Sequence, residues 1–66
     1  MDNMVKFFHL MRLQSLEEDL GKKEKIYNLI KHTEDSLVTE LNEEIEHLKN
    51  EISKTKELLK ENGVRL

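Results

Sequence analysis

The sequence predicts an all-α protein whose C-terminal half forms a parallel two-stranded coiled coil. Side chains of one seam recur at alternating spacings of three and four between Val38 and Asn62, the chain has no proline, and 38% of its residues are charged. The alternation is the heptad repeat, with which a helix buries a narrow stripe against a partner helix. A highly charged composition with this periodicity is typical of long helices with a solvated outer face.

A first helix is expected over residues 4–20, where apolar side chains form an arc wider than a surface helix needs. Asp2 or Asn3 is a suitable cap for its start. The run from Ser15 to Glu18 matches a capping box, which leaves open a second helix start at Ser15. Gly21 stands where a left-handed C-cap would lie, so the sequence predicts a turn there.

A long second helix is expected from residue 22 to residue 62. The apolar residues in the first part of this helix also recur at spacings of three and four. The last of them precedes Leu41 by four positions, where the heptad repeat requires three, and such an irregularity is called a stutter. The segment from Thr33 to Ser36 consists of cap-forming and acidic residues, so a pause there is the alternative to a continuous helix. Since neither Gly nor Pro interrupts it, the continuous helix is favoured. Gly63 predicts the helix end, and residues 63–66 form a tail.

These elements divide the chain into an N-terminal helical region, 1–37, and a coiled coil, 38–62. The residues at the seam indicate how many strands it has. Its a positions are mostly β-branched and its first two d positions are leucine, a combination that favours two parallel strands. The predicted dimer interface contains Val38, Leu41, Ile45, Leu48, Ile52, Thr55 and Leu59.

The charges beside the seam indicate the same orientation. Glu44 precedes Lys49 by five residues, and Glu51 precedes Lys56 by five. In a parallel, in-register pair each glutamate would reach the lysine of the second chain. In an antiparallel pair glutamate would face glutamate and lysine would face lysine. The sequence therefore predicts a parallel homodimer.

Composition excludes several classes of protein. With 66 residues the chain is at most one domain and would bury little surface as a monomer. The absence of cysteine rules out disulfides and thiolate chemistry. Residues 1–36 carry 7 acidic and 6 basic groups and residues 37–66 carry 7 and 5, so neither half has the basic footprint of a nucleic-acid binder. Without a long apolar run or a signal-peptide pattern, a cytoplasmic protein with no membrane contact is expected.

No catalytic, cofactor-binding or metal-ligating residue is predicted. The three histidines, His9, His32 and His47, form no pair at a spacing of four. Glu44 and His47 have the Glu-x-x-His spacing of di-metal carboxylate sites, but they fall on different sides of the seam. General acid–base chemistry needs a pocket that shifts a pKa, and a coiled-coil stalk offers none.

The functional hypothesis is a non-enzymatic dimeric module that binds another protein in an interaction or regulatory role. Its docking residues would be Phe7, Phe8 and Met11, because adaptable and aromatic side chains dominate interface energetics. The alternative is a small DNA-binding transcriptional regulator dimerised by its zipper. The basic cluster that this alternative needs is weak, since Glu24 interrupts the lysines from Lys22 to Lys25.

Overall fold

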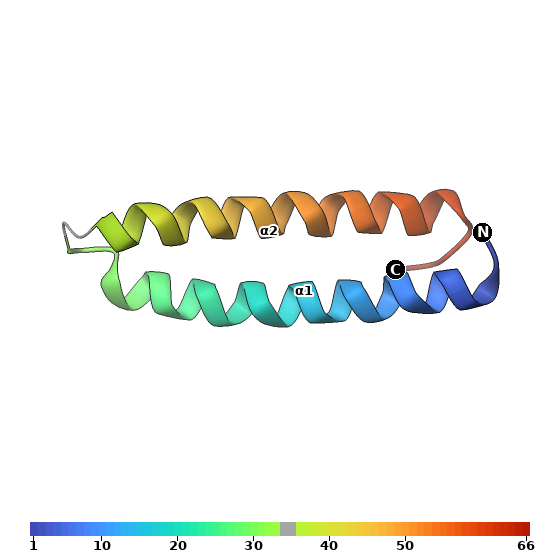
Figure 1. Ribbon diagram of the computed structural model, residues 1–66, viewed down its shortest axis with the longest axis horizontal. Coiled ribbons are helices and arrows are strands. Elements are labelled where there is room, and N and C mark those ends of the chain that lie inside the picture. The colour runs from blue at the N-terminus through green and yellow to red at the C-terminus, as the bar shows by residue number, and fades with distance from the viewer. Residues whose placement is uncertain (34–35) are drawn as a thin grey trace.

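Two antiparallel helices of nearly equal length form a hairpin in the computed structural model, which describes residues 1–33 and 36–66 (Figure 1). Helix α1 spans Asn3–Ile30 and helix α2 spans Ser36–Glu61. They pack along their length, so the molecule is a rod of 47 × 15 × 15 Å. The described residues contain no strand, and the prediction of an all-α protein is confirmed.

Helix α1 starts at the predicted cap. Asp2 has an extended backbone, and its Oδ1 accepts a hydrogen bond from the Val5 N–H at 2.9 Å. A side-chain oxygen in this position satisfies one of the amide groups that a helix start leaves without an intrahelical partner. The helix then continues through Ser15 without a second start, so the capping-box alternative is wrong.

The predicted turn near Gly21 is also wrong, because α1 runs through this glycine for nine further residues to Ile30. A left-handed cap needs a positive φ, and among the described residues only Gly63 has one. A single glycine inside a helix costs only about 1 kcal/mol relative to alanine. Continuing the helix brings Lys23, Tyr27 and Ile30 against α2, where all three are partly buried. That packing outweighs the weak stop signal.

The chain reverses after Ile30 instead. The Lys31 N–H donates to the Tyr27 carbonyl at 2.8 Å, and Thr33 donates to the Ile30 carbonyl through its N–H (2.9 Å) and its hydroxyl (2.8 Å). Thr33 therefore closes the end of α1 rather than capping α2, which begins at Ser36. The predicted interruption of the helix between Thr33 and Ser36 is therefore correct, and the continuous helix from 22 to 62 is wrong. Two residues of that predicted interruption, Glu34 and Asp35, lie outside the described residues.

Helix α2 ends as the sequence predicts. Gly63 has a φ of +82°, its N–H donates to the Lys60 carbonyl at 3.1 Å, and the Val64 N–H donates to the Leu59 carbonyl at 3.0 Å. These two bonds form a Schellman motif, which satisfies carbonyls at the helix end. The tail then crosses toward α1, where Val64 packs against the core near the N-terminus (Figure 1).

The core is a single layer of side chains between the two helices. Leu13 of α1 packs in one cluster with Ile52 and Leu59 of α2, and Leu16 and Leu20 extend this cluster along α1. Leu59 is fully buried. The hairpin therefore has one apolar interface and two outer faces that no other part of the described chain covers.

Candidate interaction surface

The seam predicted to join two chains lies against α1 of the same chain. Six of its members are buried and Val38 is partly buried; the buried ones are Leu41, Ile45, Leu48, Ile52, Thr55 and Leu59. The hydroxyl of Thr55 donates to the Glu51 carbonyl at 2.8 Å, so the one buried polar side chain of the described seam is satisfied. Pairing of this seam with a second chain remains a prediction, and it would need the side chains that α1 covers.

The two glutamates beside the seam pair with cations of α1. Glu51 Oε2 lies 3.2 Å from an Arg12 guanidinium nitrogen, and Glu44 Oε2 lies 3.5 Å from Lys23 Nζ. The sequence predicts Lys49 and Lys56 of a second chain as their partners; here Lys49 is exposed and Lys56 is partly buried. The hairpin therefore supplies its own counter-charges for both carboxylates.

Lys23 links the two helices in the part of the rod nearer the turn between α1 and α2. Its Nζ also lies 3.0 Å from Asp19 Oδ2 within α1. The hydrogen bond to Asp19 and the charges of Asp19 and Glu44 raise the pKa of Lys23 above its ordinary value of 10.5. Because raised basicity means that the protonated form is favoured, Lys23 stabilises the hairpin as a cation.

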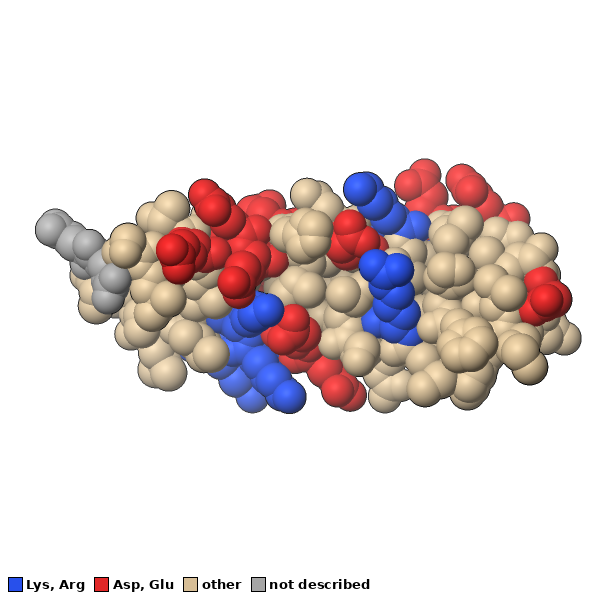
Figure 2. All heavy atoms as spheres, viewed as in Figure 1, with Lys and Arg blue, Asp and Glu red and all other residues tan. Residues whose placement is uncertain are grey.

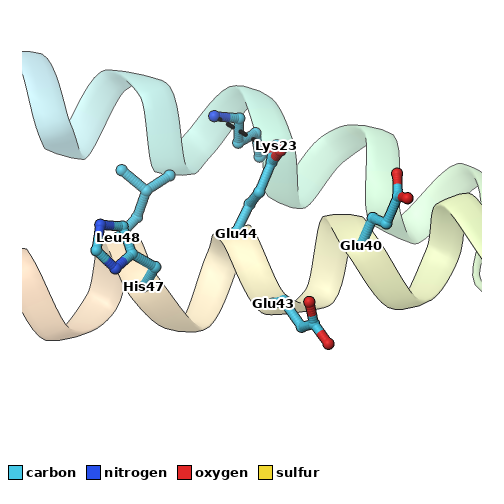
Figure 3. Close-up of a pocket in the computed structure, with 6 residues that line it drawn as sticks. All are labelled: Lys23, Glu40, Glu43, Glu44, His47 and Leu48. Atoms are coloured by element: carbon cyan, nitrogen blue, oxygen red, sulfur yellow. Dashed lines mark ion pairs between the residues drawn. The ribbon is translucent and has the colours of Figure 1, made fainter.

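A shallow groove surrounds this ion pair and is rich in acidic groups (Figure 3). Lys23 and Glu44 point toward each other across the helices, whereas Glu43 points away from α1 (Figure 3). Within residues 1–33 and 36–66, no three His, Cys, Asp or Glu side chains are grouped so that they could hold a metal ion. The feature of this groove that bears on the fold is therefore the ion pair between Lys23 and Glu44, which joins the two helices.

A cluster of exposed apolar side chains lies at the N-terminal end of α1. Met4, Phe7, Phe8 and Met11 are 53–69% exposed, and their spacing of three, one and three places them along one side of the helix. We call these four residues the N-terminal patch. It contains all three of the predicted docking residues, Phe7, Phe8 and Met11. An exposed patch of large apolar side chains on a small protein is typical of an interaction site.

Sequence reasoning missed which stripe of α1 faces α2. The partly or fully buried residues of α1 include a complete three-four repeat: Lys6, His9, Leu13, Leu16, Leu20, Lys23, Tyr27 and Ile30. The repeat was hidden because Lys6, His9 and Lys23 are polar and because α1 carries apolar residues on several sides. Strict spacing, rather than apolar content, is the signal that would have found it.

The distribution of apolar side chains is unusual for an isolated domain. Among the described residues, six hydrophobic side chains are buried and twelve large hydrophobic ones are exposed. Single exposed apolar residues are normal on protein surfaces, but here several large ones lie together at the N-terminal end of α1. The hairpin therefore has apolar surface available for a partner.

Neither described helix has an apolar stretch of the length and purity needed to cross a bilayer. Comparison of the chain with protein-family models, curated proteins and solved structures finds no match.

Proposed function

We propose that the chain is a non-enzymatic, dimeric protein-interaction module whose contact surface is the outer side of α1. The observation that carries this proposal is the N-terminal patch, in which Phe7 is 60% exposed and Phe8 is 62% exposed. Aromatic side chains bury large areas on binding and commonly act as anchors of protein interfaces.

The physical reason for a partner is the small core of the hairpin. A chain of 66 residues buries a modest fraction of its surface and commonly gains stability by oligomerisation. Two helices share one interface, so no described part of a single chain packs against the side of α1 opposite α2. Each exposed phenylalanine that a partner covers would contribute about 1.5–3 kcal/mol.

The parallel zipper over residues 38–62 is the competing form of the dimer. In that form Glu44 and Glu51 would exchange Lys23 and Arg12 for lysines of the second chain, and α1 would have to leave the seam. Opening the hairpin would expose Leu13, which is 5% exposed in the closed form. We favour a closed hairpin as the interacting unit because it keeps this core and leaves the N-terminal patch accessible.

The DNA-binding alternative has less support. Arg12 and Lys23, two of the cations of α1, are held by carboxylates at 3.0–3.5 Å. Figure 2 shows acidic and basic side chains interspersed over the middle of the visible face rather than a continuous basic surface. Non-specific DNA affinity depends on phosphate neutralisation by unpaired lysine and arginine side chains.

A photo-reactive phenylalanine analogue placed at position 8 tests the proposed function. On irradiation in cell extract, we expect covalent adducts with protein, to be identified by mass spectrometry as this chain or another. The matched control carries the analogue at Asn50, an exposed polar position on α2. Adducts that form equally at both positions, or at neither, would contradict a specific contact surface on α1.

A further inference from the structure

We infer that the partner of the outer side of α1 is a second copy of this chain, with the two α1 helices antiparallel. This inference rests on the proposed function and names the partner of the same surface. It starts from the arrangement of exposed residues along α1. The N-terminal patch occupies one end, and Ile26 (48% exposed) and Leu29 (82% exposed) form a second apolar cluster at the other end.

Polar residues separate the two clusters. Ser15, Glu18, Lys22 and Lys25 are all exposed and continue the outer side of α1 between them. Along the α1 edge of the hairpin in Figure 2, charged side chains gather toward the middle and most of the atoms toward both ends are uncharged, with one acidic group at the far right of the view. The outer side thus has the order apolar, polar, apolar.

This order is self-complementary when the second α1 is reversed. Met4 and Leu29 are equally distant along the chain from a point between Leu16 and Glu17, and so are Phe7 and Ile26. A two-fold axis through that point would bring Met4 onto Leu29 and Phe7 onto Ile26 of the second copy at the same time. Such an isologous contact uses the same surface on both chains, which is the commonest symmetry of soluble dimers.

Charge selects the antiparallel orientation over a parallel one. In a parallel, in-register pair, Glu18, Lys22 and Lys25 would each face their own copy, and like charges in direct opposition are destabilising. With the two-fold axis above, Lys25 would lie beside Phe8 and Lys22 beside Met11. A lysine stem covers apolar surface while its ammonium group stays in water or over an aromatic ring.

The length of α1 makes this contact long enough for a dimer. Its 28 residues correspond to roughly 42 Å at a rise of about 1.5 Å per residue. Two hairpins joined along this length would form a row of four helices, with the two α1 helices in contact at the centre and the α2 helices on the outer flanks. Both apolar clusters of each chain would be covered.

Cysteine pairing in mixed variants of the full chain tests the arrangement. A chain with Met11→Cys is mixed with a chain carrying Lys22→Cys in a glutathione redox buffer, and the products are measured by mass spectrometry. We expect the mixed disulfide to dominate, because the axis brings position 11 of one chain to position 22 of the other. Predominant Met11→Cys self-pairing would indicate parallel α1 helices. Self-pairing of an Arg65→Cys chain would indicate the parallel zipper, and either result would overturn the inference.

Sedimentation equilibrium of the chain without cysteines supplies the second readout. We expect a dimer, with a dissociation constant that rises roughly tenfold or more in Phe8→Ser, whose helical circular dichroism should persist because Phe8 is exposed. A chain that stays monomeric up to millimolar concentration would refute self-association. If the analogue at position 8 then still captured a different protein, the protein-binding role of the outer side of α1 would stand without this inference and without the dimer. If it captured none, both proposals would fail.

Discussion

Replacing Gly21 by alanine should stabilise the protein. Gly21 is exposed, lies nine residues before the end of α1, has no positive φ, and an added Cβ would have no atom within 4 Å. Alanine in a helix interior is favoured over glycine by about 0.8–1 kcal/mol, partly because it restricts the unfolded chain. For a domain of this size, about 1 kcal/mol raises the melting temperature by roughly 4–8 °C.

Gly63→Ala is the matched control, and it should have the opposite effect. An added Cβ would also meet nothing within 4 Å there, but the φ of +82° belongs to the left-handed region. A residue with a Cβ pays about 1–2 kcal/mol for that conformation. The two variants therefore make the same chemical change in equally open space and differ in backbone conformation.

Thermal and urea unfolding followed by circular dichroism at one fixed protein concentration would measure both effects. Concentration must be held constant because self-association adds to apparent stability. A lower melting temperature in Gly21→Ala would show that position 21 needs a left-handed backbone. The turn would then lie at Gly21, and the assignment of one α1 helix through this residue would be refuted.

Other substitutions test separate parts of the hairpin. Ile52→Ala should lower the free energy of unfolding by about 2–5 kcal/mol, which is a large share of the stability of a 66-residue domain. An unchanged midpoint of urea unfolding would mean that Ile52 is not in the core. Asp2→Ala should cost about 0.5–2 kcal/mol through loss of the bond to the Val5 N–H, whereas Asp2→Asn should retain most of the stability; equal losses in both would argue against capping. The stabilisation from Lys23 should be constant at neutral pH and be lost as the pH rises through the raised pKa of its ammonium group, so the stabilities of wild type and Lys23→Gln should converge once Lys23 is deprotonated in the folded protein. A stability difference that persists after this deprotonation would contradict the ion-pair role.

The sequence was sufficient to predict which residues of α2 form its buried stripe, and that Glu44 and Glu51 beside this stripe form ion pairs. Residues such as Ile45 and Leu48 repeat with strict spacing among polar neighbours, and burial in any helical packing selects them. The caps at Asp2 and Gly63 were also predictable, because each depends on a few adjacent residues. Local and periodic features were therefore accessible before the structure.

The partner of that stripe was not predictable from the same pattern. An apolar seam accepts either α1 of its own chain or a second copy, and Glu44 can pair with Lys23 or with a lysine of another chain. Which of the two partners covers the seam depends on where the chain turns. The competing helix-stop signals at Gly21 and Thr33 each contribute only about 1 kcal/mol. Packing over the whole length of α1 decides between them, and polar seam members such as Lys6 concealed that packing.

The outer face of α1 was predictable only in part. Phe7, Phe8 and Met11 were identifiable as docking candidates from residue type. Their position opposite the hairpin interface depends on which side of α1 faces α2, and α1 has apolar residues on several sides. Ile26 and Leu29 became candidates once the exposed side was known, because they share it with Phe8.

Single-molecule energy transfer between dyes at positions 3 and 65 tests most directly whether one chain closes on itself. A trace of doubly labelled chain is diluted into unlabelled chain, so that transfer reports distances within one molecule. Both termini lie at the same end of the hairpin (Figure 1), and we expect high transfer at every protein concentration. A long second helix after a turn at Gly21 would leave the C-terminus roughly 35 Å or more beyond the N-terminal helix. A population of molecules with low transfer, whose fraction increases with protein concentration, would therefore contradict the hairpin and favour the parallel zipper.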